Sequence, residues 1–248
     1  MTLERFLQGL AQGEETPKKA HLVQLSGFNH EELVLFRQWW PPIHTEQRRK
    51  LMGWLVSLAE ENVELDFSPI FRNCLKDKDP KVREQAVSGL WESDDRSLVD
   101  PLMALLKEDP FEQVRASAAT ALGTFSSLAA TGKLLPRYGD RIKEVLLSVV
   151  IDDEESINVR RRALESAACF DTPRIRELIK WAYTSQEPKL RLSALYAMGK
   201  TSDHAWLSTI IAETDSDDPA TRYEAVSACA ELGDEDAVPY LIHLIRDD

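Results

Sequence analysis

The side chains that could do chemistry in this chain are five histidines, three cysteines and two dense acidic clusters. None of the histidines has a second histidine or a cysteine at a spacing that zinc sites use. The acidic clusters, residues 152–155 and 215–218, lack the glycine that a calcium loop needs at its sharp turn. Both clusters precede expected helices, where carboxylates are favoured by the helix dipole. The sequence therefore predicts neither a metal site nor a bound cofactor. The histidines are His21, His30, His44, His204 and His243.

Motifs for phosphate binding and nucleophilic catalysis are also missing. Gly132-Lys133 is not a phosphate-binding loop, because Ser127 stands where the leading glycine should be and no strand is expected before it. No Gly-x-Ser-x-Gly nucleophile motif occurs. These observations predict that the chain is not an enzyme.

Arginines recur at one position of a repeated helical sequence motif, called the phrase below. They are Arg49, Arg83, Arg115, Arg160, Arg191 and Arg222, and four of the five gaps between them are 31 to 34 residues. That length is typical of one helical hairpin. We expect each arginine to be structural, with an acidic or turn-carbonyl partner in its own unit or the next. The basic run at residues 160–162 is interpreted as a solvated helix face, with Glu165 as a local partner.

Elementary helix chemistry explains the phrase, whose clearest copy is Asp-Pro-Lys-Val-Arg-Glu-Gln-Ala-Val-Ser-Gly-Leu at residues 79–90. Asp or Glu before Pro supplies an N-cap and a first-turn residue whose missing N–H costs nothing. Asp79 and Arg83 are four apart and can pair along the helix, as can Glu187 with Arg191 and Asp218 with Arg222. The closing glycine fits a left-handed cap.

A second apolar helix follows each phrase after a short polar turn, for example one that contains Ile175, Leu178, Ile179 and Trp181. A helical hairpin cannot bury its apolar face alone, so such units stack on one another. We therefore predict an all-α fold, an α-solenoid (superhelix) of about six helical hairpins.

The sequence motif Asp-Pro-x-Val-Arg-x-x-Ala-x-x-x-Leu-Gly resembles the HEAT-like repeats first noticed in phycocyanobilin lyases. The resemblance covers roughly residues 44–248 and implies one continuous repeat unit there, preceded by an atypical N-terminal helical cap at residues 1–43. HEAT-like repeats also build a di-iron hydroxylase that needs several His-Glu pairs. This chain has one such pair, His30-Glu31, outside the good repeats, so that activity is not expected.

Two segments depart from the repeat. Trp39 and Trp40 end the expected cap; Trp40 shares the apolar stripe of its helix, whereas Trp39 lies on the flank. Trp39 is either buried against the repeats or an aromatic contact for a partner chain. The 45-residue gap after Arg115 carries extra residues at 124–141, with a short helix expected at Ser126 to Ala130. This insertion is either a packed elbow or a projecting binding element.

Composition narrows the class of partner and the compartment. The net charge is −12, and residues 61–248 hold the whole acidic excess, which disfavours nucleic acid and argues against DNA-base repair. Neither a signal peptide nor a membrane-spanning stretch is recognisable. The cysteines, Cys74, Cys169 and Cys229, are odd in number and predict packed free thiols in a reducing cytoplasm.

These features favour a non-enzymatic scaffold or adaptor that presents one face of the repeat array to a partner protein. The second helices should line that face, and Lys180, Tyr183, Tyr240 and His243 fall off their apolar stripes. With Trp39, these residues are the candidate partner contacts. The alternative, implied by the resemblance alone, is a bilin-lyase-like factor that handles a tetrapyrrole on a client protein. Self-association through the apolar edge of the last helix is a further expectation.

Overall fold

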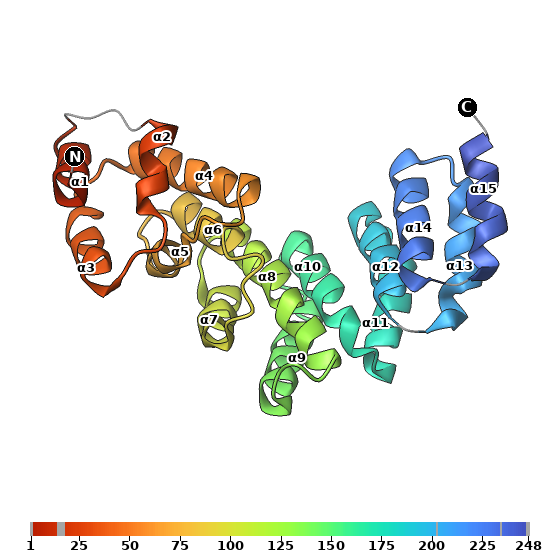
Figure 1. Ribbon diagram of the computed structural model, residues 1–248. Helices are drawn as coiled ribbons and strands as arrows, with labels where there is room; N and C mark the ends of the chain where they lie inside the picture. Colours follow the sequence, from red (N-terminus) through yellow and green to blue (C-terminus); the bar gives the residue numbers. More distant parts are fainter. Residues whose placement is uncertain (1, 14–17, 202, 234, 247–248) are drawn as a thin grey trace. The chain divides into compact units, whose positions relative to one another are not determined.

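The computed structural model describes residues 2–13, 18–201, 203–233 and 235–246, with side chains as far as residue 242. Within these ranges all regular structure is helical and there is no strand, as Figure 1 shows. Short 3₁₀ turns join several of the helices. The prediction of an all-α solenoid is therefore confirmed. The helices are α1 (Leu3–Gln12), α2 (Lys19–Leu22), α3 (His30–Trp39), α4 (Thr45–Glu61), α5 (Ser68–Cys74), α6 (Pro80–Ser88), α7 (Val99–Glu108), α8 (Glu112–Ala130), α9 (Pro136–Val150), α10 (Ile157–Ala167), α11 (Pro173–Tyr183), α12 (Pro188–Lys200), α13 (Leu207–Ala212), α14 (Pro219–Leu232) and α15 (Val238–Arg246).

Six helical hairpins follow one another from α4 to α15, and the first helix of each carries one arginine of the repeated series. Asp79 and Asp218 cap α6 and α14, because their carboxylates accept hydrogen bonds from the backbone N–H groups of Val82 and Thr221. Proline occupies the first helical position of α6, α12 and α14. The cap and proline chemistry read from the sequence therefore sets where these helices begin.

The chain forms two compact units, residues 1–105 and 106–248, and their boundary falls inside α7. We call them unit 1 and unit 2 and describe each by itself. The predicted division into a cap at residues 1–43 and repeats at residues 44–248 stays a prediction. In the described ranges no helix is long and apolar enough to cross a membrane.

In unit 1 the N-terminal helices pack on the first hairpin. A capping box begins α3, with Asn29 and Glu32 each accepting a hydrogen bond from the other's backbone N–H. Trp40 stacks on Phe36 with ring centroids 4.8 Å apart, and its Nε1 donates to Asp77 at 2.7 Å. Trp40 thus joins the segment before the hairpins to the loop that leads into α6.

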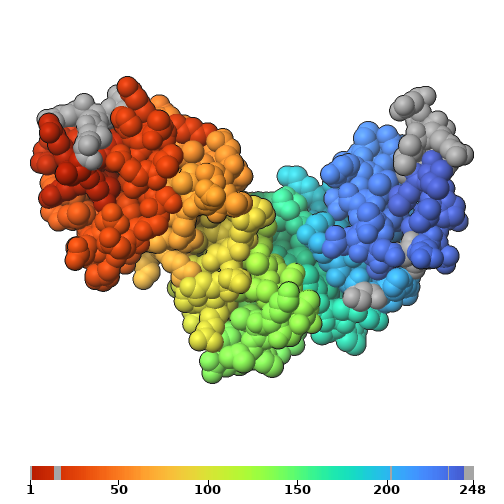
Figure 2. Space-filling view, viewed as in Figure 1, coloured from red at the N-terminus to blue at the C-terminus, as the bar shows by residue number. Residues whose placement is uncertain are grey.

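In unit 2 the first helices of successive hairpins, α8, α10, α12 and α14, contact one another in turn and form one layer. The second helices pack behind them, with α9 against α10, α11 against α12 and α13 against α14. The surface colours of unit 2 follow chain order from green to blue in Figure 2. We call the exposed sides of these two layers the first-helix face and the second-helix face.

The glycine that closes each phrase does not play the predicted role in three repeats. Gly89 has a right-handed backbone, and Gly123 and Gly199 lie inside α8 and α12, so none of the three is a left-handed cap. They are required by close packing instead, because a Cβ at Gly199 would lie 2.7 Å from the Cα of Ala228. Gly233 at the end of α14 is left-handed as predicted, with φ 67°.

The long gap after Arg115 also differs from the prediction. Ser126 to Ala130 form no separate helix; they continue α8 to its end, and α9 already begins at Pro136. The extra residues therefore lengthen both helices of one hairpin. Gly132, with φ 72°, makes the turn between them. The chain has no helix-breaking residue between Gly123 and Thr131 that could have stopped α8 earlier.

Candidate functional site

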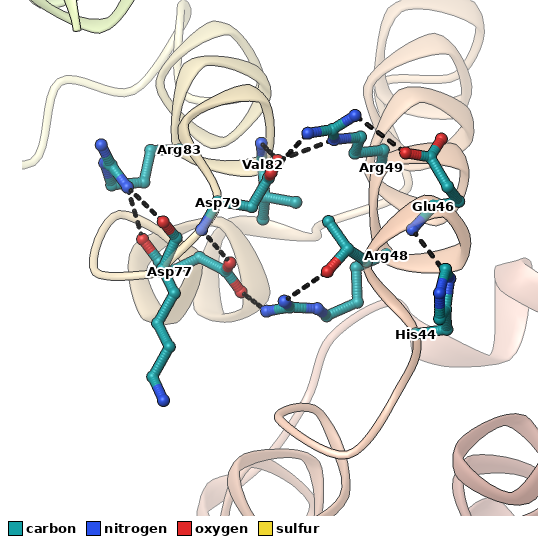
Figure 3. A network of polar contacts seen from close by, with 10 residues as sticks. His44, Glu46, Arg48, Arg49, Asp77, Asp79, Val82 and Arg83 are labelled. Carbon is teal, nitrogen blue, oxygen red and sulfur yellow. Dashed lines mark hydrogen bonds and ion pairs between the residues drawn. The ribbon is translucent and has the colours of Figure 1, made fainter.

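The arginines of unit 1 build an ion-pair network rather than a ligand site, as Figure 3 shows. Arg49 on α4 donates to both carboxylate oxygens of Asp79, at 3.0 and 2.6 Å, and so ties one hairpin to the next. Its guanidinium holds the pKa of Asp79 below the ordinary value. Arg48 forms a buried ion pair with Asp77. Arg83 donates to the carbonyls of Asp77 and Lys78.

The arginines of unit 2 follow the same rule. Arg115 makes a two-pronged contact with Glu155 and donates to the carbonyl of Asp109. Arg160 donates to the carbonyl of Val150, and Arg222 to that of Ser216. The prediction of acidic or turn-carbonyl partners is therefore confirmed for these residues and for Arg49 and Arg83.

Two finer expectations about these arginines are wrong. Asp79 receives Arg49 of the previous hairpin, and the contacts of Arg83 and Arg222 described above go to turn carbonyls rather than to the acid four residues earlier. The expectation of a solvated face also fails at Arg160, which is only 7% exposed, although Arg161 and Arg162 pair with Glu165 as predicted. The cause in both cases is the turn before the helix, whose carbonyls need donors that an arginine of this length can supply.

The predicted contacts Lys180 and Tyr183 lie one turn apart on α11, and both are engaged with the next hairpin. The Lys180 Nζ lies over the Trp206 ring, 5.8 Å from its centroid, while its side chain stays exposed. The Tyr183 hydroxyl donates to Glu213. Burial and that hydrogen bond raise the pKa of Tyr183 to about 12. Lys180 is therefore the more accessible of the two for a partner.

Trp181 was not among the predicted contacts, because the sequence pattern placed it in the buried stripe of α11. It is 41% exposed and lies beside a groove of about 290 Å³, which also contacts Ile151, Arg160 and Glu177. The Arg160 guanidinium lies 5.2 Å from the centre of the Trp181 ring. Arg160 thus fixes the ring from one side and leaves an aromatic edge on the second-helix face.

Tyr240 marks a second groove on this face. Its side chain is 49% exposed and borders a groove of about 570 Å³ between α13 and α15, with Leu207 and Ile211 on the opposite wall. His243 belongs to the same helix, but its side chain lies outside the described residues. The second-helix face therefore brings an exposed aromatic residue to each of two grooves.

Trp39 lies in unit 1 and is half-buried. Its Nε1 is buried and finds no hydrogen-bond partner among the described residues. The ring is therefore held in the packing of unit 1 while part of it remains accessible. Trp39 belongs to unit 1, whereas the other candidate residues belong to unit 2.

A polar cleft on the first-helix face of unit 2 was missed from the sequence. Its volume is about 310 Å³, and α8, α10 and α12 line it. The chemically active side chains in its wall are Arg162, Glu165, Cys169, Tyr196 and Lys200. Cys169 is only partly buried, unlike Cys74 and Cys229, so the prediction of packed thiols is wrong at this position.

A signal for this cleft was present in the repeat. The positions five and nine residues after the repeating arginine hold Thr120 and Thr124, then Glu165 and Cys169, then Tyr196 and Lys200. Those positions share one face of each first helix because they are four apart. Packing positions repeat in type, whereas these do not, and such variation is typical of a surface that the fold leaves open.

Metal chemistry has no support in the described ranges, where no group of three or more His, Cys, Asp or Glu side chains could hold an ion. His44 is the N-cap of α4, and its Nδ1 accepts a hydrogen bond from Glu46. The aromatic rings of His21 and Phe6 meet edge to face. These histidines therefore have structural surroundings.

Comparison with solved structures shows the fold. The Escherichia coli protein YibA is 17% identical, with 94% of this chain and 93% of that one covered and a TM-score of 0.50. Human deoxyhypusine hydroxylase in complex with glycerol is 16% identical, with 99% and 91% covered and a TM-score of 0.36. The prediction that the chain is not an enzyme is contradicted by these comparisons and is withdrawn. These likenesses assign no reaction to this chain.

Sequence comparison gives both a relative and a family. A protein of Pseudanabaena tenuis, named as uncharacterised phycocyanin operon protein Z, is 26% identical over 182 residues, which are 70% of this chain and 83% of that protein. A family model of HEAT repeats matches residues 68–151 and 175–248, more than half of the chain. The structure shows the hairpins that such repeats form, with the repeating arginines tying each to its turns. The chain belongs to the HEAT repeat family.

Proposed function

We propose that this repeat scaffold binds a partner protein through the second-helix face of unit 2, and that the partner is a phycocyanin-type protein. One observation carries the proposal: this face presents an exposed aromatic side chain, Trp181 or Tyr240, at each of two grooves. Aromatic residues beside pockets are the usual anchors of protein interfaces. Lys180 and, through its helix, His243 belong to the same face.

The class of partner is supported by the relative from Pseudanabaena tenuis, whose name places it with a phycocyanin operon. The acidic balance of the chain supports a protein partner over a nucleic acid, because an acidic surface releases no counterions from a phosphate backbone. Neither observation says where on the chain the partner would bind. The exposed aromatic residues at the two grooves support the second-helix face as the location.

The test is a binding titration of purified phycocyanin against the full chain by biolayer interferometry. We expect Trp181→Ala and Tyr240→Ala each to weaken binding by about tenfold or more, since an aromatic anchor contributes about 2 kcal/mol. Tyr223→Ala is the matched control, because Tyr223 is 74% exposed on α14 of the same unit but lies in a first helix. Equal affinity of all three variants and the parent chain contradicts the assigned face.

The alternative function is the handling of a tetrapyrrole on a client protein. The resemblance of the repeats to those of phycocyanobilin lyases supports it, together with the relative named for a phycocyanin operon. Absorbance titration with a free bilin separates the two functions. A shifted and saturable bilin spectrum with the chain alone supports pigment handling. An unchanged spectrum, together with binding of phycocyanin, supports the scaffold.

A further inference from the structure

The cleft on the first-helix face gathers charged and hydrogen-bonding side chains in its wall. The chain carries 42 acidic and 30 basic residues, yet the cleft wall holds two cations, Arg162 and Lys200, and one carboxylate, Glu165. Further carboxylates, Glu224 and Glu231, lie on α14 outside this lining. Glu165 and Glu231 pair with these two cations, so the cleft is an ion-paired surface and carries no excess of positive charge.

The carboxylate of the cleft is already saturated with donors. Glu165 accepts from Arg161 at 3.4 Å and from Arg162 at 2.7 Å, and the Ser193 hydroxyl also donates to it. A carboxylate with three donors has little capacity left for a ligand. Glu165 therefore positions Arg162 and does not itself bind a ligand.

The donors of the cleft, in contrast, keep unused capacity. Among the described residues, Arg162 uses only one nitrogen, on Glu165, and the Tyr196 hydroxyl has no hydrogen-bond partner. Lys200 donates to Glu231 at 2.6 Å and keeps further N–H groups, and its Nζ lies 5.6 Å from the centre of the Tyr196 ring. Burial raises the pKa of Tyr196, which keeps its hydroxyl protonated as a donor.

From this surplus of donors we propose that the first-helix cleft binds a small organic carboxylate. Arg162, Tyr196 and Lys200 donate to the carboxylate, because ionised acceptors form the strongest hydrogen bonds with guanidinium and ammonium groups. The hydroxyl-bearing wall of α8, with Thr120 and Ser127, faces the body of the ligand. A volume of about 310 Å³ accommodates one or two rings, at the small end of ligand pockets.

Cys169 supplies a readout at the site itself. It is the partly exposed cysteine of the cleft, whereas Cys74 and Cys229 are buried. The probe is 2-naphthoate, compared with the uncharged 2-naphthamide of the same shape. The rate of Cys169 alkylation by iodoacetamide is followed by mass spectrometry of the full chain, and a titration of amide chemical shifts in α8, α10 and α12 gives an independent affinity.

We expect naphthoate to protect Cys169 and naphthamide to protect it about tenfold less effectively. Lys200→Met and Arg162→Gln should each weaken naphthoate binding by about tenfold, whereas Lys200→Arg keeps it. Lys180→Met is the control, because Lys180 is an exposed lysine of the same unit on the opposite layer. Circular dichroism checks that the variants remain folded.

Equal binding of the acid and the amide overturns the proposal. So does naphthoate binding that is unchanged in both Lys200→Met and Arg162→Gln, or that Lys180→Met weakens to the same extent. The absence of any effect on thiol reactivity and chemical shifts at about 20 mM naphthoate also overturns it, since that concentration detects even millimolar affinity. These outcomes leave the proposed protein partner untouched, because that partner is assigned to the second-helix face.

Discussion

At the scale of single residues, the three cysteines should differ sharply in reactivity. Burial raises the pKa of Cys74 and Cys229, and thiolates rather than thiols react. Cys169 is partly exposed, with the Ser127 hydroxyl 3.3 Å from its sulfur. We expect Ellman's reagent to modify one thiol of the native chain quickly and three after denaturation. Fast modification of a second thiol in the native state, or persistence of the fast one in Cys169→Ser, contradicts this assignment.

Asp79 combines two roles that substitution can separate. It caps α6 and pairs with Arg49, so Asp79→Asn keeps the cap and loses the charge, while Asp79→Ala loses both. We expect Asp79→Ala to lower the free energy of unfolding by about 1 kcal/mol more than Asp79→Asn. Urea denaturation measures this difference, and Asp218→Ala against Asp218→Asn is the matched pair at the cap of α14. Identical unfolding of the two Asp79 variants would show that the cap contributes nothing.

The same residue gives a pH dependence with a defined sign. The hydrogen bond from Arg49 lowers the pKa of Asp79 in the folded chain below its ordinary value of 3.8. Its stabilising contribution is therefore present above that value and is lost as the pH falls through the folded pKa. The difference in unfolding free energy between the parent chain and Asp79→Asn should shrink as the pH falls below 3.8. A difference that grows on acidification would contradict the ion pair.

At the scale of helices, glycine spacing sets how closely the first helices approach. A Cβ at Gly199 would lie 2.7 Å from the Cα of Ala228, and backbone cannot move aside cheaply. We expect Gly199→Ala to lower the free energy of unfolding by about 1–3 kcal/mol. Gly53→Ala is the control, because its Cβ would meet the flexible end of Gln85 at 3.1 Å. Thermal unfolding followed by circular dichroism should separate them, and an equal change in both variants would sink the packing argument.

Helix starts could be predicted from the sequence, whereas helix contacts could not. Pro80 and Pro219 each follow a capping acid, and this local chemistry needs no knowledge of neighbours. The role of Gly199 depends on Ala228, a residue of the next hairpin, and so the same glycine pattern was compatible with a left-handed cap. Local signals fix an element, while the spacing between elements is decided by residues that are distant in the chain.

The candidate sites divide in the same way. The exposure of Lys180 follows from its place off the apolar stripe of α11, which the helical period alone predicts. Trp181 is adjacent and apolar, so the pattern favoured burial, whereas the structure leaves it 41% exposed with Arg160 against its ring. The cleft that contains Tyr196 and Lys200 could not be located from the sequence alone. It forms only where three helices, α8, α10 and α12, pack side by side.

At the scale of the whole molecule, charge decides which macromolecules the chain meets. With a net charge of −12, a DNA phosphate backbone is repelled, and the basic residues of the first-helix face are paired: Arg161 and Arg162 with Glu165, and Lys200 with Glu231. Paired cations release few counterions, so the usual gain on DNA binding is absent. We therefore expect no change in the fluorescence anisotropy of a labelled duplex of about 20 base pairs at about 0.15 M salt. A basic DNA-binding protein of similar size serves as the positive control. Saturable binding that falls steeply with added salt would mean that a cationic surface outweighs the acidic balance, and the argument from net charge would then fail together with the preference for a protein partner.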